Sequence, residues 1–125
     1  MENNNLRELT RAEEEVMQVL WRIKTGFVKD IIPFFPDPKP AYNTISTVVR
    51  ILEEKGFIGH RAFGKTHQYF PLVLKSEYSR FVIKNLTKGY FSGSLKNLIS
   101  FMAEEEELSI KDIEEIKKLI QKKNN

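Results

Sequence analysis

The sequence predicts a mainly α-helical protein with one small β-hairpin. Two observations support this class. Apolar residues recur at intervals of three and four along most of the chain, which is the spacing that places them on one face of an α-helix. Between these stretches, two short aromatic-rich segments flank Gly64, a pattern typical of a hairpin with a glycine turn.

The composition limits the class of protein. A chain of 125 residues suits one compact unit or a small domain with an appendage, and nine Phe, four Tyr and one Trp can fill a core. The absence of cysteine excludes a disulfide framework, a thiolate metal site and a cysteine nucleophile, and it favours a reducing compartment. No apolar run approaches the roughly 18 residues of a membrane span, and the N-terminus lacks a secretion signal. We therefore expect a cytoplasmic protein.

The first helix is predicted to begin after Thr10, because Thr10 and Glu13 have the spacing of a capping box. Its apolar stripe comprises Val16, Met17, Val19, Leu20, Trp21 and Ile23. Glu13 is expected on the opposite, solvated side, and Gly26 is expected to end the helix. A second, shorter helix is predicted over residues 29–35. A stiff connector with three prolines follows over residues 36–40.

The third helix is predicted over residues 42–55 and is closed by Gly56. Its buried stripe is expected to consist of Ile45, Val48, Val49 and Leu52. The opposite face carries short or donor-rich side chains, namely Asn43, Thr44, Ser46, Thr47 and Arg50. Solvated helix faces usually favour Glu, Lys and Gln, and threonine is a poor helix former. The composition of this face therefore indicates binding.

A β-hairpin is predicted from residues 57–63 and 67–73, joined by a turn at residues 64–66. The order of helix, helix, proline turn, polar-faced helix and hairpin is typical of a winged helix-turn-helix, whose third helix enters the DNA major groove. The net charge of +3 is concentrated between Pro40 and Lys75. Both observations favour DNA binding. The alternative is a winged-helix protein-interaction module without DNA contact.

The candidate DNA contacts come from the third helix and the hairpin turn. Asn43 suits an adenine edge, Thr44 and Thr47 suit a thymine methyl or a phosphate, and Arg50 suits a phosphate or a guanine. Cationic and hydroxyl groups around the turn suit phosphates or a minor groove. The full set is Tyr42, Asn43, Thr44, Ser46, Thr47, Arg50, Arg61, Lys65, Thr66 and His67. The alternatives are a tolerated solvated face and an ordinary turn.

No catalytic site, metal site or cofactor is expected. The sequence has no phosphate-binding glycine motif and no metalloprotease motif, and its carboxylates lie mostly in helix starts or surface runs. His60 and His67 are the only histidines, and two ligands without cysteine make a poor transition-metal site. We therefore expect a binding protein and not an enzyme.

Residues 1–75 are expected to form the winged-helix DNA-binding domain, and residues 76–125 a helical dimerisation domain. A helix interrupted at Gly89 and Gly93 is predicted first. Serine N-caps are predicted for two further helices, at Ser94 and Ser109. Their apolar stripes are not needed to close the winged-helix core, so we expect them to bury against a second copy. These residues are Leu95, Leu98, Ile99, Met102, Ile113, Ile116 and Ile120. The alternative is folding back on the same chain.

Several motifs together carry a family resemblance. They are LTRAE at 9–13, VLW at 19–21, AYNTISTV at 41–48, LEEKG at 52–56 and GKTHQYFP at 64–71, with further matches at 95–98 and 106–108. In these motifs the chain resembles the penicillinase-repressor (BlaI/MecI/CopY) family of bacterial regulators. The resemblance implies a homodimeric transcriptional repressor bound to a pseudopalindromic operator of an antibiotic- or stress-responsive operon. Thr44 and Thr47 match the family's paired recognition-helix threonines, which implies that both contact DNA.

The chain departs from the family pattern in two places. Copper-responsive relatives use cysteine pairs near the C-terminus, and this chain has none, so copper sensing is not expected. In the antibiotic-responsive members, a membrane sensor–protease system cleaves an Asn-Phe bond in the dimerisation region. The aligned bond here joins Phe101 to Met102, and both are apolar. We expect a protease of altered specificity, or control without cleavage there.

Overall fold

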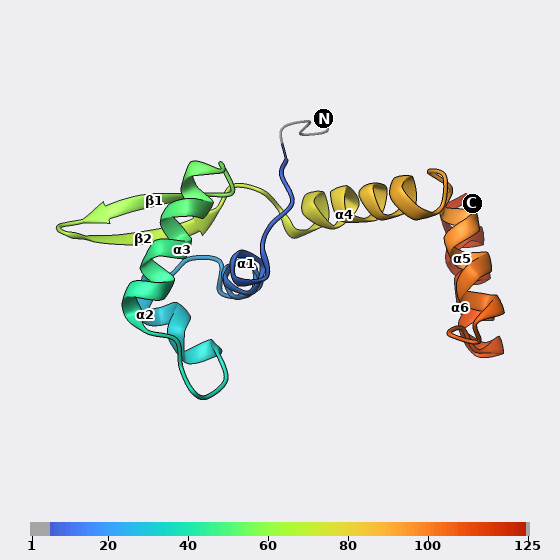
Figure 1. Cartoon of the computed structure of the whole chain (residues 1–125), viewed down its shortest axis with the longest axis horizontal. Coiled ribbons are helices and arrows are strands. Elements are labelled where there is room, and N and C mark those ends of the chain that lie inside the picture. The colour runs from blue at the N-terminus through green and yellow to red at the C-terminus, as the bar shows by residue number, and fades with distance from the viewer. Residues whose placement is uncertain (1–5, 125) are drawn as a thin grey trace. The chain divides into compact units, whose positions relative to one another are not determined.

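The computed structural model describes residues 6–124, which form a mainly α-helical chain with one β-hairpin, as predicted (Figure 1). The elements are α1 (Arg11–Ile23), α2 (Val28–Ile31), the 3₁₀ helix η1 (Ile32–Phe34), α3 (Tyr42–Glu54), β1 (Ile58–Phe63), β2 (Thr66–Pro71), α4 (Lys75–Tyr90), α5 (Leu95–Glu104) and α6 (Ile110–Asn124). The chain divides into two compact units, an N-terminal unit up to Phe81 and a C-terminal unit from Val82.

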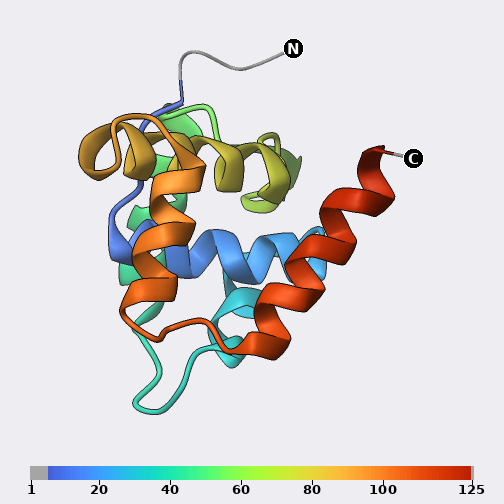
Figure 2. The ribbon, with the colours of Figure 1, turned by 90° about the vertical axis from the view of Figure 1, so that its right-hand side faces the viewer.

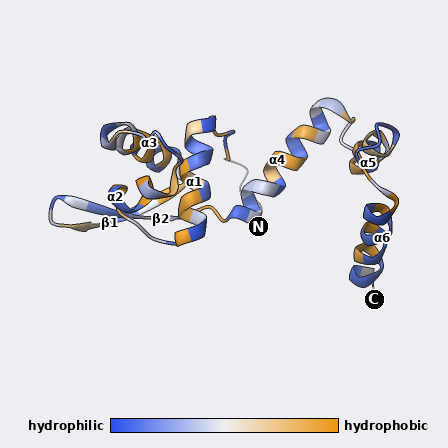
Figure 3. Cartoon of the chain, turned by 90° about the horizontal axis from the view of Figure 1, so that it is seen from below, coloured by the Kyte–Doolittle hydropathy of each residue, from blue (hydrophilic) through white to orange (hydrophobic). Residues whose placement is uncertain are grey.

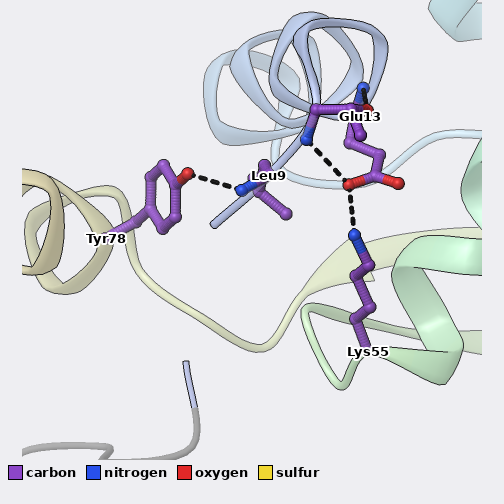
Figure 4. A network of polar contacts seen from close by, with 5 residues as sticks. Leu9, Glu13, Lys55 and Tyr78 are labelled. Atoms are coloured by element: carbon purple, nitrogen blue, oxygen red, sulfur yellow. Dashed lines mark hydrogen bonds and ion pairs between the residues drawn. The ribbon is translucent and has the colours of Figure 1, made fainter. Parts of the chain in front are cut away.

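This boundary lies six residues beyond the one expected from the sequence, inside α4. The reason is the packing of Tyr78, which is only 4% exposed. Its ring lies 5.6 Å from that of Phe57 and 6.1 Å from that of Trp21. Its hydroxyl accepts a hydrogen bond of 2.9 Å from the Leu9 backbone N–H (Figure 4). The first part of α4 therefore belongs to the core of the N-terminal unit.

Helix α1, seen end-on in Figure 1 and lengthwise in Figure 2, begins with the predicted capping box. The Glu13 backbone N–H donates to Thr10 Oγ1 at 3.2 Å, and the Thr10 N–H donates to Glu13 Oε1 at 3.0 Å. The prediction that Gly26 ends the helix is wrong. The last helical residue is Ile23, and Lys24 caps the end with a φ of 77°.

Gly26 instead pairs with Tyr69 of β2 through two backbone hydrogen bonds of 2.8 and 3.0 Å. A Cβ at this position would meet Ile23 Cδ1 at 2.7 Å, so only glycine fits without displacing its neighbour. The predicted second helix is also corrected, because α2 is a single turn that continues as η1. Pro33 lacks the N–H that an α-helical hydrogen bond would need at this point, and a 3₁₀ turn accommodates it.

Helix α3 buries the predicted stripe, and hydrophobic residues follow one of its faces (Figure 3). Its C-terminus has the two hydrogen bonds of a Schellman motif. The Gly56 N–H donates to the Glu53 carbonyl, and the Phe57 N–H donates to the Leu52 carbonyl, both at 3.0 Å. Gly56 takes the required positive φ of 82°. The motif buries Phe57 directly after the helix.

Strands β1 and β2 pair antiparallel from Ile58 opposite Pro71 to Phe63 opposite Thr66. The turn therefore contains only Gly64 and Lys65, and Thr66 belongs to the second strand. Gly64 has a φ of 64° and Lys65 has no positive φ, which fits a two-residue type II′ hairpin turn. The hairpin, called the wing below, closes the core together with α1 and α3, and Trp21 Nε1 donates to the Val73 carbonyl at 2.9 Å.

In the C-terminal unit, α4 continues through Gly89, so the predicted interruption there is wrong; Gly93 lies in the turn that follows, with a φ of 75°. The predicted serine caps are confirmed. Ser94 Oγ accepts from the Asn97 N–H at 3.1 Å, and Ser109 Oγ accepts from the Asp112 N–H at 3.0 Å. Within residues 6–124, no helix has both the length and the apolar content needed to cross a membrane.

Candidate nucleic-acid interface

The predicted binding residues of α3 lie on its exposed side, because the buried apolar residues of the helix lie on the opposite side. Tyr42 is 55% exposed, and Asn43, Thr44, Thr47 and Arg50 are also exposed, whereas Ser46 is half-buried. From Tyr42 to Arg50 this side has amide, hydroxyl, phenol and guanidinium groups and no carboxylate.

Two of these side chains already bond to the backbone of their own helix. Thr47 Oγ1 donates to the Asn43 carbonyl at 2.9 Å, and Arg50 Nε donates to the Ser46 carbonyl at 3.4 Å. The Thr47 hydroxyl can therefore still accept a hydrogen bond, and its methyl group remains available for apolar contact. Nε carries one of the five guanidinium N–H groups, so Arg50 keeps donors for a phosphate or a base.

The wing separates its candidate residues between two faces. His67 lies on the face that also carries His60 and Tyr69, according to the strand register. Arg61 lies on the other face, where its guanidinium is 6.0 Å from the centre of the Phe70 ring. Lys65 is exposed at the turn itself.

A recess of about 800 Å³ lies between α3, α2 and the wing. Its lining residues are Phe27, Val28, Lys29, Tyr42, Ser46, Arg50, Glu53, Lys65, Thr66, His67 and Tyr69. Lys29, Arg50 and Lys65 are cationic and Glu53 is the one carboxylate of the lining, so the recess favours an anion. The structure thus brings six of the predicted contacts together here. Asn43, Thr44, Thr47 and Arg61 lie outside the lining.

The wing is connected to the C-terminal end of α3 through three side chains, Glu53, His60 and His67. His60 Nδ1 lies 2.5 Å from Glu53 Oε2, and the two imidazole rings stack 4.0 Å apart at an angle of 8°. Tyr69 is buried beneath them, and both burial and the Glu53 carboxylate raise the pKa of its phenol. Among the described residues, no three His, Asp or Glu side chains are placed to hold a metal ion.

Glu13 and Lys55 form a second connection, at the same C-terminal end of α3 (Figure 4). Lys55 Nζ lies 2.6 Å from Glu13 Oε1, and Glu13 is 5% exposed, so the prediction of a solvated Glu13 is wrong. Burial alone would raise the pKa of the Glu13 carboxyl, but hydrogen bonds from Lys55 and Thr10 and the Lys55 charge lower it below its ordinary value. The pair fixes the C-terminus of α3 against α1.

Sequence reasoning missed the parts played by Glu13, Lys29 and Glu53. Lys29 enters the recess from the short helix α2, and Glu53 looks in the sequence like an ordinary solvated residue. For Glu13 a signal was available in the sequence. In a capping box the glutamate side chain folds back to the backbone at the start of its helix and so does not extend freely into solvent.

Comparison with known proteins identifies the family. The penicillinase repressor family model matches residues 9–122. The chain belongs to the penicillinase repressor family. The resemblance seen in the sequence is therefore confirmed, and the match covers both units of this family member.

The relatives match along most of their lengths. The methicillin resistance regulatory protein MecI of Staphylococcus aureus (strain N315) is 32% identical over 122 residues, which are 97% of this chain and 99% of MecI. The penicillinase repressor of Bacillus licheniformis is 24% identical over 119 residues, 94% of this chain and 93% of the relative.

A solved structure of a repressor domain matches the fold. The solution structure of the DNA-binding domain of the repressor BlaI aligns with a TM-score of 0.50 and 26% identity. The alignment covers 62% of this chain and 94% of that domain. The predicted winged-helix class is thereby confirmed.

Proposed function

We propose that the chain is a DNA-binding transcriptional repressor that acts as a homodimer on a pseudopalindromic operator in the bacterial cytoplasm. The observation that carries the proposal is the exposed side of α3, which presents hydrogen-bonding groups without a carboxylate from Tyr42 to Arg50. Such a surface suits both the donor and acceptor pattern of major-groove base edges and the negative backbone. The names of the relatives, a methicillin resistance regulatory protein and a penicillinase repressor, support the same function and suggest an antibiotic- or stress-responsive operon.

The two parts of the interface are proposed to act differently. Asn43, Thr44 and Thr47 lie outside the recess on the exposed side of α3, where base edges would be read. Lys65 at the wing tip and Arg61 on the outer wing face suit phosphates, whose contacts position a protein without reading sequence. Binding and not catalysis is the proposed activity.

Titration of duplex DNA tests this division. After footprinting on the upstream DNA of the chain's own gene, wild type and variants are titrated with operator and scrambled duplexes at several salt concentrations. Asn43→Ala and Thr47→Ala are expected to cost about 1–3 kcal/mol on operator and little on scrambled DNA. Arg61→Ala and Lys65→Ala are expected to weaken both duplexes and to reduce the salt slope by about one unit each.

Alanine is a better helix former than asparagine or threonine, so the α3 variants should remain folded, which circular dichroism checks. Wild-type affinity in all four variants would contradict the assigned surfaces. Failure of the wild type to bind any duplex would favour the alternative, a protein-interaction module.

The proposed dimer uses the C-terminal unit. Leu95 and Ile120 are 52% and 55% exposed in the single chain, and Met102, Ile113 and Ile116 are only half-buried. A second copy would remove these apolar surfaces from water, and a two-fold symmetric repressor would match two operator half-sites.

Charge substitution in α6 tests the dimer. Ile113→Glu combined with Ile120→Glu is expected to halve the mass measured by sedimentation, because two carboxylates would be buried in the interface. Lys118→Glu is the matched control, since its helical position faces away from both isoleucines. A wild type that sediments as a monomer at micromolar concentration, or a double variant that remains dimeric, would contradict the proposal.

We also propose that repression ends either through a membrane sensor–protease system of altered specificity or without cleavage at residues 101–102. Phe101 and Met102 lie in the last turn of α5, and their carbonyls accept hydrogen bonds of 3.0 and 2.9 Å from the N–H groups of Glu105 and Glu107. A protease that binds an extended strand would have to break these bonds.

Mass spectrometry after exposure of the source cells to a cell-wall antibiotic separates the two routes. Rapid scission between Phe101 and Met102 is expected for the altered protease, and an intact chain on derepressed promoters is expected for the second route. Cleavage confined to another bond would contradict the alignment of this site with the family's Asn-Phe bond.

A further inference from the structure

The tip of the wing exposes a phenylalanine that lies outside the hydrophobic core. Phe63 is the last residue of β1, directly before the two-residue turn, and it is 54% exposed. Phe57 and Tyr69, which fill the core beside the wing, are 0% and 6% exposed. Single exposed apolar residues are common on protein surfaces, so exposure alone does not identify a contact. What distinguishes Phe63 is how its ring is held and what surrounds it.

Three contacts hold the Phe63 ring and the turn in one arrangement. The ring packs edge-to-face on Phe27, with the ring centres 5.7 Å apart and the planes at 66°. The Lys29 ammonium lies 6.0 Å from the centre of the Phe27 ring. Thr66 Oγ1 donates to the Phe63 carbonyl at 2.8 Å across the turn. A side chain that is fixed before binding loses less conformational entropy on binding, so a braced exposed ring favours a contact function.

The surface around Phe63 is cationic. Residues 55–76 contain no carboxylate side chain. Arg61 lies two residues before Phe63 on the same strand and therefore on the same face of the wing, and Lys65 is exposed in the turn. A ring among cations without a carboxylate suits a polyanion that also offers apolar surface, as the sugars and base edges of DNA do.

Phe63 is also continuous with the surface that is proposed to bind DNA. Phe27, which braces the ring, lines the recess beside α3 together with Lys65 and Thr66 from the turn. The wing tip projects beyond the helices of the N-terminal unit, so the ring stays accessible (Figure 1). DNA that contacts α3 and Lys65 would therefore pass close to Phe63.

The minor groove is the part of DNA that fits a single ring. It is about 6 Å wide in B-DNA, whereas two paired strands already lie about 4.8 Å apart before their side chains are added. The wing as a whole is therefore too wide to enter, but one flat side chain at its tip is not. Apolar side chains inserted into this groove contact sugars and base edges.

We propose that Phe63 enters the minor groove beside the half-site read by α3 and makes operator affinity depend on the base pair it meets there. This inference rests on the proposed DNA-binding function. Phe63 supplies the apolar contact, and Arg61 and Lys65 hold the phosphates on either side of it. Guanine is the base that carries an amino group on the minor-groove floor, so the ring favours an A·T pair over a G·C pair at this position.

Inosine in place of guanine tests the groove directly. Inosine lacks the 2-amino group, so an I·C pair alters the minor groove and keeps the major-groove edge of G·C. The base pairs beside the wing are located by comparing hydroxyl-radical footprints of the wild type and Lys65→Ala. Duplexes with A·T, I·C or G·C at this position are then titrated by fluorescence anisotropy. We expect the wild type to bind the A·T and I·C duplexes about tenfold more tightly than the G·C duplex.

The variants isolate the ring. Phe63→Ala is expected to bind the A·T duplex about tenfold more weakly than the wild type and to bind all three duplexes about equally. Phe63→Leu keeps an apolar side chain and should be intermediate. Phe34→Ala is the matched control, because Phe34 is 45% exposed, has the Arg22 guanidinium 5.3 Å from its ring centre and lines a separate groove along α1. It should keep the wild-type affinities, and urea denaturation checks that each variant is folded.

The comparison of the three duplexes needs only the wild type, so it stands even if a variant fails to fold. Equal affinity for all three, or a preference for A·T that I·C does not share, would overturn the inference and leave the proposed function standing. An unchanged preference or affinity in folded Phe63→Ala would also overturn it, as expected if the ring docks a protein instead. Absence of wild-type binding to every duplex would remove the proposed function itself.

Discussion

Phe57→Ala is expected to lower the free energy of unfolding of the N-terminal unit by about 3–5 kcal/mol, a large part of the about 5–15 kcal/mol that stabilises a typical domain. Phe57 is 0% exposed, and its ring packs on Tyr78 at 5.6 Å. Its carbonyl also accepts the N–H groups of Leu72 and Val73 at 2.8 and 3.2 Å. Removal of the ring leaves a cavity where the helix cap, the wing and α4 meet.

Urea denaturation followed by tryptophan fluorescence measures this effect, because Trp21 is the only tryptophan and is buried in the same core. Phe57→Leu, which keeps most of the apolar volume, should cost less than about 1.5 kcal/mol. Phe34→Ala is the control, since Phe34 is 45% exposed and its removal should change stability by only about 0.5 kcal/mol. Equal unfolding midpoints for Phe57→Ala and the wild type would contradict the assigned core.

Lys55→Met is expected to destabilise the N-terminal unit by about 3 kcal/mol at pH 7, because it leaves the Glu13 carboxylate buried without its cation. Lys55→Met combined with Glu13→Gln should recover much of the loss, since the charge is removed with its partner. Arg11→Met is the matched control. Arg11 pairs with Glu15 at 3.6 Å, but its side chain is 95% exposed, so the expected change is about 0.5 kcal/mol.

The same pair makes stability depend on pH. The pKa of Glu13 is lowered in the folded chain, so its contribution is fully present above the pKa of an unfolded glutamate and is lost as the pH falls through the lower folded value. The wild type should therefore lose stability on acidification below about pH 4.5, and Glu13→Gln should lose less. A double-mutant cycle with zero coupling energy at pH 7 would contradict the assigned interaction.

Local signals determined the elements that the sequence predicted well. The capping box at Thr10, the Schellman glycine at Gly56 and the serine caps at Ser94 and Ser109 each depend on residues within five positions of one another. The stripes of α1 and α3 follow the helical period, so the buried and exposed sides could be assigned without a structure. The same helical period placed the polar residues of α3 on its exposed side.

Where the hydrophobic periodicity was weak, predictions made from neighbouring residues in the sequence were wrong. Gly89 was predicted to interrupt a helix that in fact includes it and ends one residue later, at Tyr90, since a glycine lowers helix stability only by about 1 kcal/mol. The α2–η1 transition depends on how the chain around Pro33 packs, and Gly26 is used for pairing with Tyr69, which lies far away in sequence.

The sequence by itself determined the helical class, the hairpin, the exposed polar side of α3 and the family. Only the tertiary structure decided that Glu13 is buried against Lys55, that Glu53 meets His60, and that the wing and α3 enclose a recess lined by Lys29. The physical reason is that helix caps and stripes arise from neighbours three or four residues apart. The ion pairs and the recess join side chains from different elements, and their distances exist only once the core has packed.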